Sequence, residues 1–338
     1  MYTGLQVARG VAAILVLLLH ASKSVNIFFD CKSLADFWKF GAIGVDFFFV
    51  LSGFIIYWIH SKDKDDLQSM LVYLKKRVIR IYPPFILISI ALLIAYKLFP
   101  SLSLGNKHIG IITSLFLIPT PPLEPALAIF WTMMHEVLFY VFFTLFYIKN
   151  KLFPIALILW GLLIFLAYFY LSSGIIKTFI LNPHNLQFIL GIVAAFLIIK
   201  EKGSYLHLIV GVIMIVFYIL YIEGNHGYNI PLNNLEEKLY LGISFMLIVI
   251  GLCQLEEKIK FPNIFIYLGA ASYSIYLIHT PVLSLLIRLA TKIDNYVDLQ
   301  AHIIFIPLSV LTLLVGCLYH ISWEKPVLNV LRKKYLAH

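Results

Sequence analysis

Charged residues are scarce in this chain. Of its 338 residues, 13% are Asp, Glu, Lys or Arg, whereas 61% are apolar or aromatic. A soluble domain of this size needs a polar shell, which so few charges cannot supply. The mean hydropathy of +0.93 therefore excludes a disordered chain and an ordinary soluble domain, and it predicts a protein whose surface mostly faces lipid.

Cysteine is also rare, and its spacing excludes two further classes of protein. Cys31, Cys253 and Cys317 lie far apart, with no pair at the spacing of a metal-binding motif. This pattern argues against a disulfide framework and against a zinc or iron–sulfur centre. We therefore expect no metal site, and any chemistry must come from other residues.

The apolar residues gather into long runs. A bilayer core of about 30 Å needs roughly 20 apolar residues of helix for each crossing. Ten segments qualify, at residues 5–22, 41–59, 82–99, 129–148, 153–171, 184–200, 205–222, 238–254, 264–287 and 302–322. We predict an all-α, polytopic integral membrane helical bundle of about ten helices, forming one domain over residues 1–338 without an appended soluble domain.

The basic residues divide unequally between the two sides of this predicted bundle. Seventeen of the 26 Lys and Arg residues fall on the side that holds both termini, and nine fall on the other side. The positive-inside rule therefore places both termini in the cytoplasm and the protein in the cell (inner or plasma) membrane. Because topology accounts for the basic excess, it does not indicate nucleic-acid binding.

Ionisable residues inside the predicted spans are candidates for function, because an unpaired charge in lipid is costly. Arg9 and His20 stand eleven residues apart in the first span, which puts them on one helix face about 16 Å apart. Arg9 alone could be an arginine reaching for lipid headgroups. Its alignment with His20 favours a shared functional face instead.

Several titratable groups are expected at the depth of His20. Asp46 in the second span, His135 and Glu136 in the fourth and His279 in the ninth all fall in the outer half of the membrane. A structural polar network that joins helices is one interpretation. A wet reaction chamber is the other.

A second cluster lies at the inner end of the third span. Arg77 and Arg80 are three residues apart and share a helix face, which suits bidentate binding of phosphate groups. The alternative is a basic cluster that sets topology or binds anionic lipid. Together with the outer layer, it describes a conduit with a cationic inner mouth.

Several sequence fragments resemble the acyltransferase 3 family, and the resemblance covers nearly the whole chain. Arg9 and His20 in LQVARGVAAILVLLLH match the family's signature of arginine, ten residues and histidine. The other fragments are GVDFFFVLSGFII, KKRVIRIYP, FWTMMHEVLFYVFF, ASYSIYLIHTP and WEKP. A departure is the fourth span, where Met133, Met134 and His135 replace more usual, less polar residues.

The resemblance implies a membrane O-acyltransferase. Such an enzyme would move an acyl group, most commonly acetyl, from cytoplasmic acyl-CoA as co-substrate, with no permanently bound cofactor. The acceptor would be a hydroxyl of a cell-surface or exported polysaccharide, or of its lipid-linked precursor. The expected partners are therefore acyl-CoA, a carbohydrate or lipid-linked glycan, and membrane lipid, but no nucleic acid.

The resemblance also implies roles for particular residues. Arg9, Arg77 and Arg80 would bind the CoA phosphates. His20 would act as general base on the acceptor hydroxyl, or accept the acyl group transiently. A carboxylate would orient its imidazole, and we prefer Glu136 over Asp46 for that role.

The acceptor is expected to meet aromatic and histidine side chains. Trp131 and Tyr140 flank Glu136 and would line a substrate cleft together with His279. Ser52, in LSGF, is a poor candidate for a nucleophile, because no strained strand-to-helix turn precedes it. Its neighbour Gly53 indicates close helix packing instead.

Two other classes of function remain open from the sequence. A transporter or flippase could pass a lipid-linked sugar through the same polar core without covalent chemistry, although the inverted repeats typical of transporters are not evident. A structural partner in a polysaccharide assembly complex is the third possibility. Consumption of acyl-CoA by the purified protein would separate the enzyme from both.

Overall fold

A computed structural model describes residues 2–100, 108–225, 234–256, 258–297 and 300–336. Extended backbone pairs within these residues only at one isolated bridge, between Ile109 and Glu124, so the described chain is helical as predicted. The helices are α1 (Thr3–Phe29), α2 (Lys32–Trp38), α3 (Ile43–His60), α4 (Leu67–Leu98), α5 (Ile111–Phe116), α6 (Phe130–Phe143), α7 (Leu145–Ile148), α8 (Phe153–Tyr170), α9 (Asn185–Ile199), α10 (Leu206–Asn225), α11 (Leu235–Gln254), α12 (Asn263–Val297), α13 (Ala301–Tyr319) and α14 (Lys325–Leu336).

Eight described helical stretches are long and apolar enough to cross a membrane. They are Thr3–Phe29, Lys32–His60, Leu67–Leu98, Phe130–Ile148, Asn150–Tyr170, Ile176–Ile199, Asn263–Asp294 and Ala301–Leu336. The predicted segments 205–222 and 238–254 form α10 and α11, which are not among these eight. The protein is therefore a polytopic helical membrane protein, and the count of ten crossings stays a prediction.

Helix α4 begins well before the apolar segment predicted at 82–99. It starts at Leu67, where the Asp66 side chain accepts a hydrogen bond from the Ser69 backbone N–H at 2.7 Å, and it continues through Pro83 and Pro84. Tyr319 donates to the Pro84 carbonyl oxygen at 2.7 Å, beside this proline pair. As a result, the basic cluster is carried on a helix, which fixes the direction of its side chains.

The helices approach one another most closely at glycines. A Cβ atom added at Gly53 of α3 would collide with the Phe188 carbonyl of α9, and one at Gly191 of α9 would collide with the Val50 carbonyl of α3. The close packing predicted at Gly53 is confirmed. Small residues permit such approach in membrane bundles, where burial drives helices together less than it does in water.

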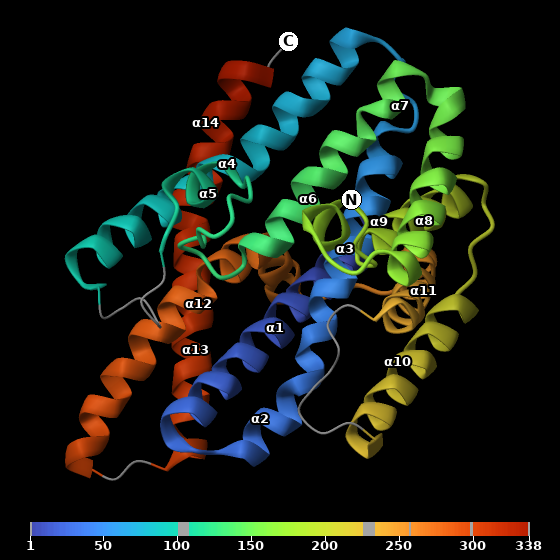
Figure 1. Cartoon of the computed structure of the whole chain (residues 1–338). Helices are drawn as coiled ribbons and strands as arrows, with labels where there is room; N and C mark the ends of the chain where they lie inside the picture. Colours follow the sequence, from blue (N-terminus) through green and yellow to red (C-terminus); the bar gives the residue numbers. More distant parts are fainter. Residues whose placement is uncertain (1, 101–107, 226–233, 257, 298–299, 337–338) are drawn as a thin grey trace.

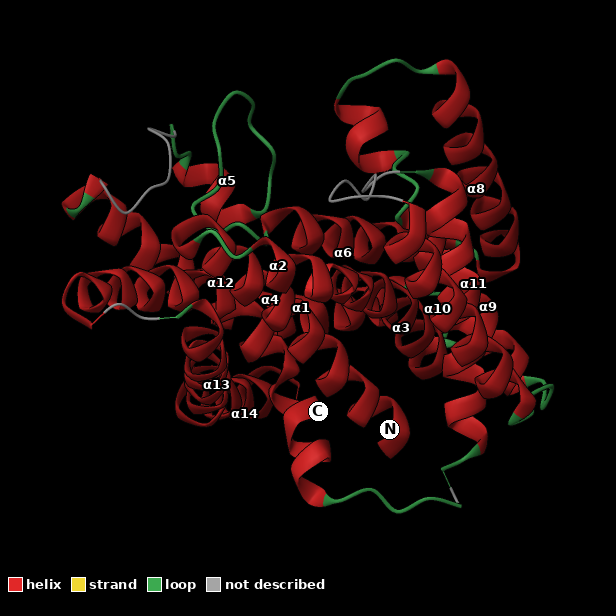
Figure 2. Ribbon diagram, turned by 90° about the horizontal axis from the view of Figure 1, so that it is seen from below, coloured by secondary structure: helices red, strands yellow, loops and turns green. Residues whose placement is uncertain are grey.

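The arrangement centres on α1. It packs against α12 and α13 on one side and against α3 on the other, and α3 in turn packs against α9 and α11 (Figure 1; Figure 2). The start of α4 and the end of α14 lie at the same end of the molecule, at the top of Figure 1. These two helices also contact each other, and a cavity opens beside them.

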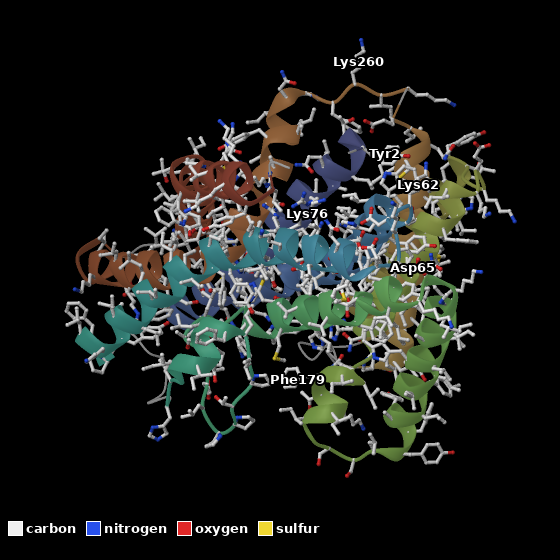
Figure 3. All side chains as sticks on the ribbon, turned by 90° about the horizontal axis from the view of Figure 1, so that it is seen from above. Tyr2, Lys62, Asp65, Lys76, Phe179 and Lys260 are labelled. Carbon is white, nitrogen blue, oxygen red and sulfur yellow. The ribbon has the colours of Figure 1, made fainter. Side chains whose placement is uncertain are left out.

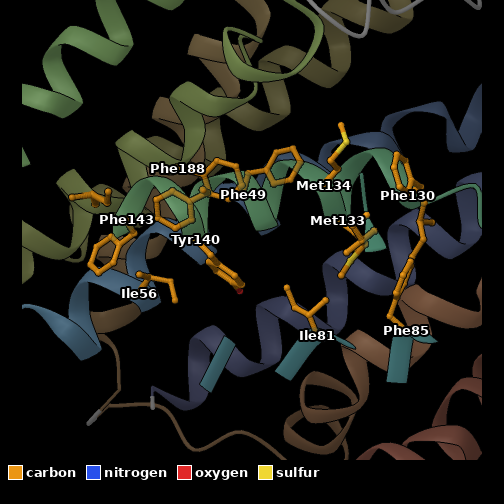
Figure 4. Close-up of a cluster of buried hydrophobic side chains, with 14 of the residues drawn as sticks. Phe49, Ile56, Ile81, Phe85, Phe130, Met133, Met134, Tyr140, Phe143 and Phe188 are labelled. Carbon is orange, nitrogen blue, oxygen red and sulfur yellow. The ribbon is translucent and has the colours of Figure 1, made fainter. Parts of the chain in front are cut away.

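An aromatic core supports one wall of that cavity. Figure 4 shows part of it, in which Phe188 of α9 meets side chains of α3 and α6. The rings of Phe139 and Phe188 stack with centroids 4.5 Å apart, and Tyr140 belongs to the same cluster. Because stacked, buried rings resist reorientation, α6 is held firmly enough to position Glu136.

Candidate functional site

A cavity of about 710 Å³ lies among α1, α3, α4, α6, α12 and α14. Its size is within the range of small-molecule sites. The polar side chains that line it are Gln6, Arg9, Ser52, Lys76, Arg77, Arg80, Thr132, Glu136, Tyr140, Ser272, Tyr273, Tyr276 and Arg332. We call this cavity the cationic pocket, because five of these side chains are basic and Glu136 is the acidic one.

The basic side chains of the cationic pocket differ in burial. Lys76 on α4, labelled in Figure 3, and Arg332 on α14 are exposed. Arg9, Arg77 and Arg80 are half-buried. The charge therefore continues from the protein surface into the interior, as a site for an extended polyanion requires.

Arg80 is held by a buried carboxylate. Its Nη1 donates to Oε1 of Glu324 at 2.5 Å, and its guanidinium lies 5.0 Å from the centre of the Tyr273 ring. Glu324 is fully buried and also accepts from Ser274 Oγ at 2.6 Å and from His320 Nδ1 at 2.7 Å. Through these bonds Glu324, at the end of the helical segment His320–Glu324 that precedes α14, contacts both α4 and α12.

Arg77 is held differently, by neutral partners. Its Nη2 donates a hydrogen bond to His60 Nε2 at 3.1 Å, and His60 Nδ1 donates one to Asp63 Oδ2 at 2.7 Å. The guanidinium also lies 5.5 Å and 5.7 Å from the ring centres of Tyr73 and Tyr140, a cation–π geometry. Its Nε is buried without a hydrogen-bond partner among the described residues, so Arg77 is oriented but retains capacity for an anion.

Arg9 has a similar free capacity. Its Nη1 donates to the side-chain oxygen of Gln6 at 3.1 Å, one turn earlier on α1. Within the part of the chain that the structure describes, no carboxylate forms an ion pair with Arg9. The three arginines predicted to bind phosphate thus line one pocket, although Arg80 already has an acidic partner.

Glu136 and Tyr140 lie one helical turn apart on α6, and both line the pocket. The Tyr140 hydroxyl donates a short hydrogen bond to Glu136 Oε1, and Ser52 of α3 donates to the same oxygen at 3.4 Å. The structure does not place Glu136 against His20, as the orienting role predicted for it would require. Glu136 lies in the pocket with the arginines instead.

His20 lies beyond the pocket. Its Nδ1 is 2.9 Å from the Val16 carbonyl oxygen one turn earlier, so Nδ1 carries the proton and Nε2 of the neutral ring carries the lone pair. A backbone carbonyl therefore has the tautomer-fixing role that was predicted for Glu136 or Asp46. The physical reason is local, because a side chain in a helix reaches the carbonyl four residues before it.

His279 stands beside His20, as the shared depth suggested. The two ring centroids are 4.9 Å apart, and His279 Nδ1 donates to the Tyr276 carbonyl at 2.5 Å. The Nε2 atom of His279 is buried with no hydrogen-bond partner in the described residues. The Tyr276 ring, 5.5 Å from that of His279, lines the pocket and shares a 2.8 Å hydrogen bond with Thr132. Tyr276 thus connects the pocket to the histidine pair.

Asp46 bonds to residues of two other helices and does not line the cationic pocket. It accepts hydrogen bonds from Lys238 of α11 at 2.9 Å and from Gln187 of α9 at 2.6 Å, and the Asp46 and Lys238 side chains are each 4% exposed. This pairing does not bring Asp46 to His20, and the catalytic role considered for Asp46 stays a prediction. A buried carboxylate that is already neutralised by lysine joins α3 to α9 and α11, which supports the packing role.

Trp131 also lies outside the pocket lining. Its ring faces His184 and His135, with centroids 5.4 Å and 6.2 Å away, and it is 37% exposed. His135 Nδ1 donates a 3.0 Å hydrogen bond to Asn185 Oδ1 and so belongs to the contact between α6 and α9. The cleft residues predicted together are thus separated, with Tyr140 in the pocket, His279 beside His20, and Trp131 elsewhere.

Sequence reasoning missed two charged residues of the site. Glu324 stood in the recognised WEKP fragment but received no role, and Arg332 was counted only as a topological charge. Lys76 was expected in the basic cluster with Arg77 and Arg80, without a role of its own. The available signal for Glu324 was its position just after the predicted span 302–322, because an acidic side chain so close to lipid needs a partner. Nothing in the sequence places Arg332 near the pocket, because α14 folds back onto α4 only in the tertiary structure.

The described residues contain no group of three or more His, Cys, Asp and Glu side chains arranged to hold a metal ion. The candidate site, as the contacts above describe it, consists of two parts. One is the cationic pocket, with its carboxylate and hydroxyl groups. The other is the histidine pair, which we define as His20 and His279, behind Tyr276.

Two comparisons with known proteins identify related sequences. The family model described as an acyltransferase domain matches residues 2–321. The chain is 27% identical over 318 residues to the exopolysaccharide production protein ExoZ of Rhizobium meliloti (strain 1021), an alignment that covers 90% of this chain and 94% of that protein. No solved structure matches the chain significantly.

The family match includes the histidine pair and most of the cationic pocket, since it spans the helices that carry Arg9 and His20, Arg77 and Arg80, Glu136, and His279. It ends at residue 321, before α14. Because the model covers nearly the whole chain, this protein is a member of the acyltransferase 3 family.

Proposed function

We propose that this protein transfers an acyl group, most commonly acetyl, from cytoplasmic acyl-CoA to a hydroxyl of a cell-surface or exported polysaccharide or its lipid-linked precursor. The observation that carries the proposal is the cationic pocket, in which five basic side chains lead inward to Glu136. A relative named for exopolysaccharide production supports the choice of acceptor class. Family membership favours this activity over a transporter or a structural partner.

The polyanionic nucleotide of CoA matches the pocket in charge and size. Arginine binds phosphate with two parallel, charge-assisted hydrogen bonds, and a half-buried site strengthens them. With the phosphates held by Arg9, Arg77 and Arg80, the pantetheine arm extends past Glu136 and Tyr140 toward Tyr276. The thioester then approaches the histidine pair, which lies behind Tyr276 and beyond the pocket lining.

His20 supplies the base in this proposal. The lone pair on Nε2 accepts the proton of the acceptor hydroxyl while the oxygen attacks the thioester carbonyl carbon. The carbon–sulfur bond then breaks, the CoA thiolate leaves and takes up the proton, and the ester remains on the acceptor. Attack by Nε2 itself, with an acyl-histidine intermediate, uses the same geometry.

Replacement of Arg77 tests the donor site. Arg77→Ala should weaken acyl-CoA binding about ten- to a hundredfold, because charge-assisted hydrogen bonds contribute roughly 1.5 to 3 kcal/mol each. Arg77→Lys should restore binding only in part, since lysine cannot form the bidentate contact. Isothermal titration calorimetry of the detergent-purified protein with acetyl-CoA measures the dissociation constants of both variants.

The matched control for Arg77 is Lys97→Ala, because exposed Lys97 is on the same helix but does not line the pocket. Arg80→Ala is a poorer test, since it would also leave the buried Glu324 unpaired. An Arg77→Ala protein that is folded and binds acetyl-CoA as tightly as the wild type would reject the pocket as the donor site.

The proposal requires the pocket mouth to face the cytoplasm, and thiol labelling checks this. In a Cys31→Ser background, a cysteine placed at exposed Asp65 or Lys334 should be shielded from an impermeant maleimide added to intact cells. A cysteine at exposed Lys32 should be labelled, because it lies on the side with fewer basic residues. Labelling of Asp65→Cys in intact cells would contradict the proposed orientation. As a control, each cysteine should react once the cells are permeabilised.

A further inference from the structure

Helix α14 completes the entrance of the cationic pocket, although it lies outside the residues matched by the family model. Arg332 and Leu336 of α14 line the pocket together with Lys76 of α4. The two helices also meet through Lys75, whose ammonium lies 5.5 Å from the centre of the Tyr335 ring. The end of the chain thus contributes directly to the site.

The position of Arg332 is set from within the bundle. Glu324, immediately before α14, is fully buried and bonded to Arg80, Ser274 and His320. Arg332 follows eight residues later, about 12 Å along the helix at 1.5 Å per residue. A rigid helix anchored at this end holds Arg332 over the pocket mouth.

Among the described residues, four of the five cations in the pocket have no acidic partner. Arg9, Lys76, Arg77 and Arg332 form no ion pair within the described ranges, whereas Arg80 pairs with Glu324. Like charges around one opening repel each other and raise the affinity for a multivalent anion. The two outermost of these groups, Lys76 and Arg332, are exposed to solvent.

We propose that Arg332, together with Lys76, binds the 3′-phosphate of the CoA donor, so that the terminal helix makes the enzyme selective for CoA over its dephospho form. This inference depends on the proposed function, in which acyl-CoA enters the pocket. It adds a residue and a selectivity that the activity itself does not require.

The chemistry of CoA assigns its phosphates to different depths. The thioester stands at one end of the molecule and must reach the histidine pair, so the nucleotide remains toward the mouth. The 5′-diphosphate is attached to the pantetheine arm and meets the half-buried Arg9, Arg77 and Arg80. The 3′-phosphate lies on the far side of the ribose, and the cations left for it are the exposed pair at the entrance.

Binding of CoA and of dephospho-CoA to the full-length, detergent-purified protein tests this assignment. The wild type should bind CoA about ten- to a hundredfold more tightly than dephospho-CoA, as expected for one charge-assisted contact. Arg332→Gln should lose most of this preference by binding CoA more weakly, while its affinity for dephospho-CoA stays the same. If Arg332 had only a structural role, Arg332→Gln would weaken the binding of CoA and of dephospho-CoA equally.

Two neighbouring lysines provide matched controls. Lys333→Gln and Lys334→Gln remove the same charge from the same helix, but neither residue lines the pocket. Both variants should keep the wild-type preference for CoA. If they lose it as Arg332→Gln does, the effect comes from the general charge of a basic surface, and the specific assignment is wrong.

A lipid headgroup offers the same phosphate chemistry as the nucleotide, so the measurement is repeated in nanodiscs. The preference for CoA should persist when phosphatidylcholine is partly replaced by phosphatidylglycerol. Loss of this preference would show that Arg332 binds anionic lipid headgroups instead of the 3′-phosphate, and it would overturn the inference. Equal wild-type affinity for CoA and dephospho-CoA would overturn this inference alone, whereas no binding of CoA at all would overturn the proposed function as well.

Discussion

His20→Ala is expected to abolish acyl transfer while leaving acyl-CoA binding intact. The imidazole does not line the cationic pocket, so its removal should leave the donor contacts in place. Its Nε2 is the proposed base, and loss of general base catalysis typically lowers a rate by about 10² to 10⁴-fold. The protein should still fold, because the ring makes one hydrogen bond, to a carbonyl of its own helix.

The assay for His20 is mass spectrometry of the O-acylated glycan, with titration of acetyl-CoA on the same preparations. His207→Ala is a suitable control, since His207 is bonded locally to Ser204 at the start of α10 and has no part in the site. Full acylation by His20→Ala would remove the histidine from the mechanism. A variant that loses donor binding as well would show that His20 acts on the pocket and not on the transfer step.

Glu324→Gln is expected to destabilise the protein strongly and to release α14. Oε1 of Glu324 accepts from Arg80, and Oε2 accepts from Ser274 and His320. An amide in the same place must turn its NH₂ group toward one of these donors, whichever way it is oriented. Removing one partner of a buried ion pair costs about 3 to 5 kcal/mol, because the remaining charge is left without compensation.

The stability of Glu324→Gln is measured as a lower midpoint of thermal unfolding in detergent and as faster proteolysis near α14. The double variant Arg80→Met, Glu324→Leu should recover part of the lost stability, since apolar side chains can replace a buried pair. It should nevertheless bind acyl-CoA weakly, because Arg80 is missing. An unchanged unfolding midpoint for Glu324→Gln would contradict the anchoring role.

Much of the pocket could be predicted before the fold was known. Arg77 and Arg80 share a face because they are three residues apart, and Glu136 and Tyr140 share another because they are four apart. Rules of helix geometry place such pairs whatever the tertiary structure is. They also aligned Arg9 with His20, yet the structure puts Arg9 in the pocket and His20 beyond it, because residues on one face can still reach different neighbours.

Counting residues along the spans predicted that His20 and His279 lie close together, but it did not predict which way Asp46 faces. His20, Asp46 and His279 were placed in one layer by counting residues, and His20 and His279 do meet. Asp46 instead turns toward Lys238, 192 positions away in the sequence. Counting residues gives height along a helix, whereas the rotation of the helix depends on its packing against its neighbours.

The sequence by itself determined a polytopic helical membrane protein, because the bilayer sets the length of the apolar runs that can cross it. The tertiary structure alone decided which charges meet. Close contacts at Gly53 and Gly191 set how α3 and α9 pack, and the buried Glu324 brings α14 back over α4. Such pairings depend on side chains distant in the chain, so no local pattern encodes them.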